Sequence, residues 1–98
     1  MMKKIILACA GGFSTSMLMS KMRDAALEAG HEVNILAIPE NDIHEHTDSD
    51  IILLGPQISH LLEDIQKEVN IPVEVINSLD YGMMNGSKVF EEAWNKIK

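Results

Sequence analysis

Residues 9–16 read Cys-Ala-Gly-Gly-Phe-Ser-Thr-Ser and carry the side chains of this 98-residue chain that are best suited to chemistry. Two adjacent glycines let the backbone turn tightly, so that successive N–H groups point inward. Three consecutive hydroxyl residues follow, and a helix that begins near Thr15 directs the positive end of its dipole to the same place. The segment therefore predicts an anion-binding loop with a thiol, Cys9, at its edge, where the same dipoles stabilise a thiolate.

Cys9 is the only cysteine in the sequence, so it forms no internal disulfide, no thiolate metal cage and no dithiol redox pair. A lone cysteine at a strand end is usually a small buried hydrophobic residue. The neighbours of Cys9 favour a nucleophile instead, because they place a thiolate beside a phosphate site. We expect Cys9 to be catalytic and the residues that follow it to bind phosphate, namely Ala10, Gly11, Gly12, Phe13, Ser14, Thr15 and Ser16.

The loop differs from the common phosphate-binding motifs. No lysine follows a second glycine at Walker A spacing, and Gly11 and Gly12 are adjacent rather than spaced as in a dinucleotide fingerprint. In Cys-x5-Arg phosphatases an arginine six residues after the cysteine clamps the phosphoryl group, whereas the residue here is Thr15. A nucleophile without that clamp, and without an obvious acid for a leaving group, is expected to accept a phosphoryl group and release it slowly to water. That behaviour is typical of a carrier.

Short apolar runs and helical periodicity indicate the elements that position this loop. The run Ile5–Ala8 does not alternate, which is typical of a central strand in a parallel sheet covered on both faces. Apolar residues at i, i+4 spacing predict a helix from residue 14 or 15 to residue 29, and Gly30 supplies its stop. Further strands are predicted at 33–38, 51–54 and 73–76, further helices at 56–69 and around 89–97, and a loop or short surface helix at 39–50.

The order of these elements calls for a parallel sheet with right-handed crossovers and helices on both faces. We therefore predict fold class α/β, as a single three-layer domain over residues 1–98, because this length fits one domain. Ligands of such sheets bind beyond the carboxyl ends of the strands, which is where Cys9 and its loop stand.

Composition and charge limit the partners. Hydrophobic residues make up 46% of the chain and charged residues 23%, as in soluble globular domains. The net charge of −7 disfavours non-specific binding to nucleic acid or to an anionic membrane surface. The apolar run that begins at Ile5 stops at Gly11 and is too short to span a membrane, so we expect a cytoplasmic protein.

Several segments together resemble one known family. Ile5–Ser16, followed by Met17-Leu18, looks like the phosphorylation loop of the IIB component of the lactose/cellobiose class of the bacterial phosphoenolpyruvate-dependent sugar phosphotransferase system. Leu53–Ile58, which reads Leu-Leu-Gly-Pro-Gln-Ile, resembles the family's signature after the third strand. Val73–Ile76 and Leu79–Gly82 resemble its fourth strand and the following turn, so the resemblance covers the whole chain.

The resemblance implies a four-stranded parallel sheet in the order 2-1-3-4, similar in shape to low-molecular-weight tyrosine phosphatases. It implies that Cys9 accepts a phosphoryl group from a phosphohistidine of a IIA component. The phosphoryl group would then pass to a β-linked disaccharide of the cellobiose, lactose or chitobiose type that is bound by the membrane component IIC. By position, residues 10–16 form the phosphate cradle, and Gly55, Pro56 and Gln57 border the site.

No metal and no other cofactor is expected. The protein is expected to be a monomer that docks transiently, held at the inner face of the cell membrane through IIC. Exposed apolar side chains near the loop are expected to contact the partners, and these are Phe13, Met17, Met83 and Met84. His44 and His46 are interpreted as a solvated surface rather than a metal site. Asp80 is interpreted as a turn-forming residue rather than a general acid.

Other functions remain open on the same scaffold. Thr15 in place of arginine speaks against a low-molecular-weight phosphatase, and the lack of a second cysteine speaks against an arsenate reductase. A regulatory or partner-binding module would need Cys9 to be dispensable. Hydrolysis of an aryl phosphate that depends on Cys9 would favour the phosphatase.

Overall fold

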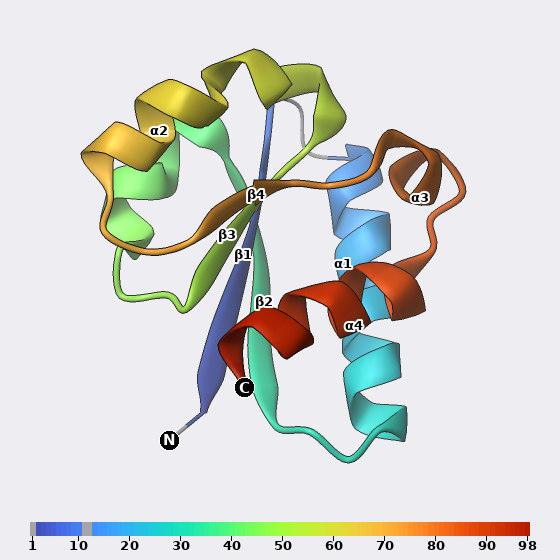
Figure 1. Cartoon of the computed structure of the whole chain (residues 1–98). Coiled ribbons are helices and arrows are strands. Elements are labelled where there is room, and N and C mark those ends of the chain that lie inside the picture. The colour runs from blue at the N-terminus through green and yellow to red at the C-terminus, as the bar shows by residue number, and fades with distance from the viewer. Residues whose placement is uncertain (1, 11–12) are drawn as a thin grey trace.

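A four-stranded parallel sheet runs through the middle of the molecule, with helices on both of its faces (Figure 1). The computed structural model describes residues 2–10 and 13–98. The order of the strands is β2-β1-β3-β4, as predicted. The strands are β1 (Lys3–Cys9), β2 (Val33–Pro39), β3 (Ile51–Leu54) and β4 (Val73–Val75).

The central strand β1 is buried from both sides. Ile5, Ile6, Leu7 and Ala8 are each at most 1% exposed, which explains why its apolar run does not alternate. The register pairs Cys9 with Pro39 of β2. Because the strands are parallel, β1, β2 and β3 end at the same border of the sheet, which we call the carboxyl edge.

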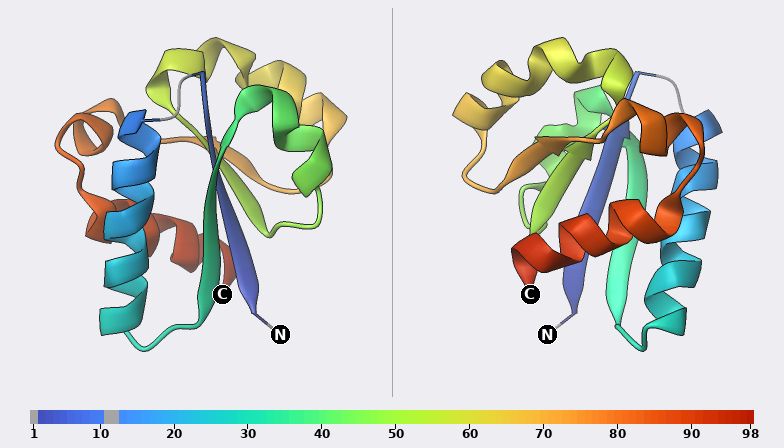
Figure 2. Two further views of the ribbon diagram at one scale, coloured as in Figure 1. Left: turned by 180° about the vertical axis from the view of Figure 1, so that it is seen from behind. Right: turned by 45° about the vertical axis from the view of Figure 1, so that its right-hand side comes forward.

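Helices follow each strand and separate into two layers (Figure 2). The α-helices α1 and α4 cover one face, and α2 with the 3₁₀ helices η1 and η2 covers the other. Alternate side chains of β1 and β3 therefore enter two different cores, which confirms the predicted three-layer α/β fold. Within the described residues, no helix is long and apolar enough to cross a membrane. The bounds are α1 (Phe13–Glu28), η1 (Glu40–His46), η2 (Pro56–Leu61), α2 (Leu62–Glu68), α3 (Ser78–Gly82) and α4 (Gly86–Ile97).

Residues 56–69 do not form the single helix that their periodicity predicts. The 3₁₀ helix η2 is interrupted at Ile58, with φ −115° and ψ 23°, before α2 begins. Pro56 has no N–H to donate, and the N–H of Ile58 bonds to the carbonyl of Gly55 at 3.0 Å in a tighter turn. This turn carries Ile58 into the core, where it is 2% exposed. The burial of the Ile58 side chain thus accompanies the loss of a regular first helical turn.

The segment after β4 is a short helix, α3, where the sequence predicts only a turn. The side-chain oxygen of Asn77 accepts hydrogen bonds from the N–H groups of Leu79 at 2.9 Å and Asp80 at 3.2 Å. These are the bonds of an N-cap residue, and they start the helix. The stretch between β2 and β3, for which the sequence allows a loop or a short surface helix, forms the 3₁₀ helix η1, and Ile43 on this helix is buried in the core.

Candidate functional site

Cys9 is the last residue of β1, the strand whose end lies at the carboxyl edge near the start of α1 (Figure 1). It is 3% exposed, whereas Ala10 is exposed. The first turn of α1 contains no acidic residue. The positive end of this helix is therefore not opposed by a carboxylate of its own first turn, which suits a bound anion.

Gly55 lies against Cys9 at the end of the neighbouring strand. Its N–H donates to the carbonyl of Ala8 at 2.9 Å, which extends the pairing of β1 and β3 past Leu54. A β-carbon placed on Gly55 would be 3.4 Å from the Cβ of Cys9 and 2.9 Å from Oε1 of Gln57. Of the three predicted border residues, Gly55 therefore lies against the cysteine, and Oε1 of Gln57 lies beside Gly55.

Thr15 is joined to a residue that the sequence did not single out. Its hydroxyl oxygen lies 3.3 Å from the hydroxyl oxygen of Tyr81, and either group is able to donate the hydrogen bond. Thr15 is 1% exposed and Tyr81 is 7% exposed. The signal available in the sequence was a polar-tipped aromatic residue four positions after Asn77, the cap of α3.

The structure describes only part of the remaining predicted cradle. Gly11 and Gly12, which are predicted to bind phosphate, lie outside the described residues. Phe13 and Ser14 are described only as the backbone start of α1, so the predicted contact role of the Phe13 side chain also lies outside the description. Ser16 is exposed in the first turn of α1.

Exposed apolar side chains lie on the two helices that meet at the carboxyl edge. Met17 of α1 is 59% exposed, and Leu79 of α3 and Met83, which follows it, are each 68% exposed. We call these three residues the apolar rim. Met84 instead is partly buried against the core beneath α1 and α4. Leu79 was not singled out in the sequence, because its exposure depends on the short helix α3.

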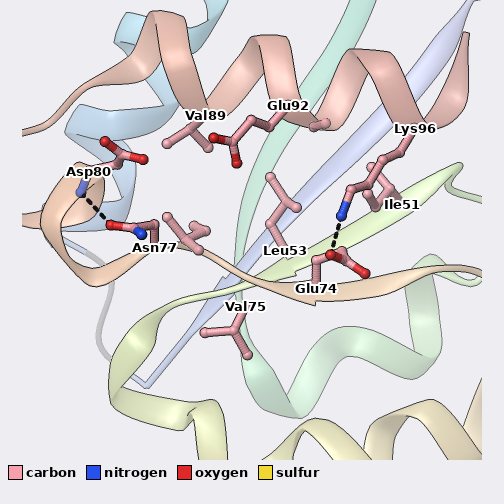
Figure 3. Close-up of a pocket in the computed structure, with 11 residues that line it drawn as sticks. Ile51, Leu53, Glu74, Val75, Asn77, Asp80, Val89, Glu92 and Lys96 are labelled. Atoms are coloured by element: carbon pink, nitrogen blue, oxygen red, sulfur yellow. Dashed lines mark hydrogen bonds and ion pairs between the residues drawn. The ribbon is translucent and has the colours of Figure 1, made fainter.

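Asp80 lines a small cavity between β4 and α4 (Figure 3). Its carboxylate lies 4.0 Å from the ammonium group of Lys88, and its side chain is 9% exposed. The cavity has a volume of about 40 Å³ and is also lined by Val89 and Glu92, but not by Cys9. This position supports a structural role for Asp80 in the α3 segment rather than that of a general acid.

The two histidines of η1, His44 and His46, are not part of a cluster of metal-ligating side chains among the described residues. His44 pairs with Glu68 of α2 at 3.1 Å, with both side chains more than half exposed. Across residues 2–10 and 13–98, no group of three or more histidine, cysteine, aspartate or glutamate side chains is arranged to hold a metal ion.

The sequence matches a known family over most of its length. The model of the family described as "PTS system, Lactose/Cellobiose specific IIB subunit" matches residues 4–92. The oligo-beta-mannoside-specific EIIB component of Bacillus subtilis (strain 168) is 45% identical over 96 residues, which cover 94% of this chain and 93% of that protein. The galactose-specific EIIB component of Lactococcus lactis subsp. cremoris (strain MG1363) is 42% identical over 102 residues, with coverage of 95% and 94%. The cellobiose-specific EIIB component of Lactococcus lactis subsp. lactis (strain IL1403) is 41% identical with the same coverage.

Solved structures agree with this match. The solution structure of the cellobiose-specific phosphotransferase IIB component from Borrelia burgdorferi has a TM-score of 0.83 at 40% identity, covering 99% of this chain and 93% of that one. The lactose-specific IIB component domain from Streptococcus pneumoniae covers both chains completely with a TM-score of 0.87, and at 15% identity it shows the shared fold alone. The chain belongs to the lactose/cellobiose-specific IIB family of the phosphotransferase system.

Proposed function

We propose that this protein is a phosphoryl carrier in sugar uptake, in which Cys9 accepts a phosphoryl group from the phosphohistidine of a IIA component and passes it to a sugar bound by a membrane IIC component. The observation that carries the proposal is the position of Cys9 at the buried end of the central strand, beside the first turn of α1 and against Gly55. Open parallel sheets bind ligands at this edge. Membership of the IIB family supports the same chemistry.

In the first step, the sulfur of Cys9 attacks the phosphorus in line with the bond to the donor's imidazole nitrogen. The P–S bond forms as the P–N bond breaks, and the electron pair of the broken bond goes to the imidazole. The backbone N–H groups of residues 10–16 and the hydroxyls of Ser14 and Ser16 hold the equatorial oxygens of the transferring group. In the second step a sugar hydroxyl attacks the phosphorus, the P–S bond breaks, and the Cys9 thiolate returns while the hydroxyl proton passes to the membrane partner or to solvent.

Two observations support a carrier over a hydrolase. Thr15 stands where a Cys-x5-Arg phosphatase has its arginine, and its hydroxyl is engaged with Tyr81 at 3.3 Å. The carboxylate of Asp80 lies near Lys88 between β4 and α4, so it does not supply a proton to a leaving group at Cys9. Without a guanidinium clamp or a placed acid, attack of water on phosphocysteine is slow.

The partners meet the protein at the carboxyl edge, because the phosphoryl group enters and leaves there. The apolar rim offers them an adaptable surface, since methionine side chains repack easily against different partners. IIA and IIC dock there in turn, on a cytoplasmic monomer that reaches the inner face of the membrane through IIC. We take residues 1–98 as one IIB phosphocarrier domain.

The names of the relatives bear on the class of sugar. Their names specify oligo-beta-mannosides, galactose and cellobiose. These names support a saccharide substrate, and we propose a β-linked disaccharide held by IIC.

The proposal is tested by following the intact mass of the protein with phosphoenolpyruvate, the two general phosphotransferase proteins and a lactose/cellobiose-class IIA. We expect the native chain to gain the mass of one phosphoryl group, to keep it without sugar, and to lose it when membranes with IIC and a β-linked disaccharide are added. Rapid loss without sugar, together with Cys9-dependent hydrolysis of an aryl phosphate, would favour a phosphatase. No gain under conditions that phosphorylate a known IIB would favour a regulatory module.

A further inference from the structure

The hydroxyls of Thr15 and Tyr81 form a buried contact between segments that lie 66 residues apart in the sequence. Thr15 lies in the first turn of α1, which follows the loop from Cys9, and Tyr81 lies in α3, which follows β4. Both side chains are at least nine-tenths buried. The contact therefore ties α3 to the end of α1 that lies beside Cys9.

The helix α3, which carries Tyr81, is held in place by contacts of its own. Asn77 caps it at the end of β4. The carbonyl of Asp80 accepts a hydrogen bond from the N–H of Asn85 at 2.9 Å, just before α4. The Asp80 carboxylate lies 4.0 Å from Lys88 of α4. These contacts hold α3 in place and do not involve the Tyr81 hydroxyl. Tyr81 therefore contacts Thr15 from a helix that is already fixed.

We propose that Tyr81 is a positioning residue for the phosphoryl-accepting site, because its hydrogen bond to Thr15 fixes the first turn of α1 relative to Cys9. This inference rests on the proposed function and assigns Tyr81 a role in transfer to Cys9. The N–H groups of a first helical turn have no partner inside the helix, and they face an anion bound at the helix end. A small shift of the turn misplaces these donors when charge spreads over the phosphoryl oxygens in the transition state.

A buried hydroxyl pair holds a position more strictly than apolar packing does. When the first turn of α1 moves away from Tyr81, each hydroxyl leaves a partner inside the protein, which costs free energy. Removing the Tyr81 hydroxyl alone keeps the ring in the core beneath α1 and α4. The Tyr81→Phe variant therefore separates the hydrogen bond from the packing of the side chain.

The test measures the rate of phosphoryl uptake at Cys9 by rapid quench and intact mass, over a range of IIA concentrations, at a temperature where every variant is folded. Tyr81→Phe and Thr15→Val are each expected to lower the limiting rate about tenfold, with the half-saturating IIA concentration unchanged. The double variant is expected to be no slower than the slower single variant, because both substitutions remove the same hydrogen bond between Thr15 and Tyr81. Thr15→Ser keeps a hydroxyl and is expected to restore most of the rate.

Ser49 provides a matched control for the loss of a buried hydroxyl. It is 4% exposed, and its Oγ donates to the carbonyl of His46 at 2.8 Å. It lies between η1 and β3, one residue before Asp50, whose N–H bonds to Lys4 near the start of β1. Ser49→Ala is expected to lower the midpoint of urea unfolding and to leave the rate of phosphoryl uptake unchanged.

Three results would overturn the positioning role while leaving the proposed function intact. They are equal limiting rates in the native chain and Tyr81→Phe, additive losses in the double variant, and a loss of rate in Ser49→Ala as large as that in Tyr81→Phe. If the native chain itself takes up no phosphoryl group, the proposed function fails and the positioning role fails with it.

Discussion

Gly55 packs so closely on Cys9 that a β-carbon on Gly55 would contact the Cβ of Cys9 at 3.4 Å. The backbone of Gly55 has φ −60° and ψ 150°, a conformation open to other residues. The backbone conformation therefore does not require glycine here, and the room for a β-carbon is limited by Oε1 of Gln57 at 2.9 Å and by Cys9. The segment after β3 is in this way packed against the end of β1.

Gly55→Ala is expected to slow phosphoryl uptake at Cys9 about tenfold while the protein stays folded. The new methyl group would touch Cys9 and displace Oε1 of Gln57, which would otherwise lie 2.9 Å away. The displaced atom ends a flexible side chain, so the free energy of unfolding should change by less than about 1 kcal/mol. Uptake by rapid quench and unfolding in urea check both parts. A variant that is as fast as the native chain would contradict the assignment of Gly55 to the border of the site.

Local sequence patterns were sufficient for the sheet and for the position of Cys9 in it. The buried run of β1, the strand ends marked by Pro39 and by Gly55-Pro56, and the amphipathic stripe of α4 each depend on neighbours in the sequence, and the structure confirms the parallel sheet that they predict. The strand order, which the family resemblance implied, is confirmed as well. The place of Cys9 at the carboxyl edge follows from the same patterns.

The details that local patterns missed depend on contacts between distant segments. Ile58 leaves the helical conformation because the core beneath η2 accepts its side chain, which periodicity does not reveal. The helix α3 depends on the cap at Asn77, and the partner of Thr15 is Tyr81, far away in the sequence. Pairings of this kind appear only when the topology brings two segments to the same edge.

Met17→Gln is expected to raise the half-saturating concentration of IIA about fivefold and to leave the limiting rate unchanged, because it weakens docking and not chemistry. Leu27→Gln is the matched control, since Leu27 is 76% exposed in the last turns of the same helix, away from Cys9. Steady-state phosphoryl uptake over a range of IIA concentrations measures both values. Equal effects of the two substitutions would contradict a docking role for the apolar rim.

Gly86→Ala is expected to lower the free energy of unfolding by about 1–3 kcal/mol. Gly86 begins α4 where this helix crosses α1, and a β-carbon there would lie 2.5 Å from Cβ of Lys21 and 2.8 Å from the backbone N of Met22. Neither helix backbone is able to yield without moving the core between them. Gly82→Ala is the control, because nothing lies within 4 Å of its β-carbon position. Urea unfolding that gives the same midpoint for both variants would rule out the close crossing.

Asp48 makes stability sensitive to acid. Its side chain accepts a hydrogen bond from Nζ of Lys4 at 3.0 Å, and this bond lowers the pKa of Asp48 below its ordinary value of 3.8. Because the folded state favours the charged carboxylate, the contribution is present above pH 3.8 and is lost as the pH falls through the lower folded pKa. Asp48→Asn should therefore lower the urea midpoint slightly at neutral pH and not at strongly acidic pH. Glu32→Gln, which removes an exposed carboxylate between α1 and β2, serves as the control. A difference between Asp48→Asn and the native chain that persists at strongly acidic pH would exclude this ion pair as its cause.

The central claim is that Cys9 itself carries the phosphoryl group, and the most direct measurement compares the native chain with Cys9→Ser by intact mass after incubation with phosphoenolpyruvate, the general phosphotransferase proteins and IIA. We predict one phosphoryl group on the native chain and none on Cys9→Ser, with both proteins folded to the same extent by circular dichroism. A phosphoryl group on Cys9→Ser, at a histidine or at a hydroxyl of residues 14–16, would contradict the account.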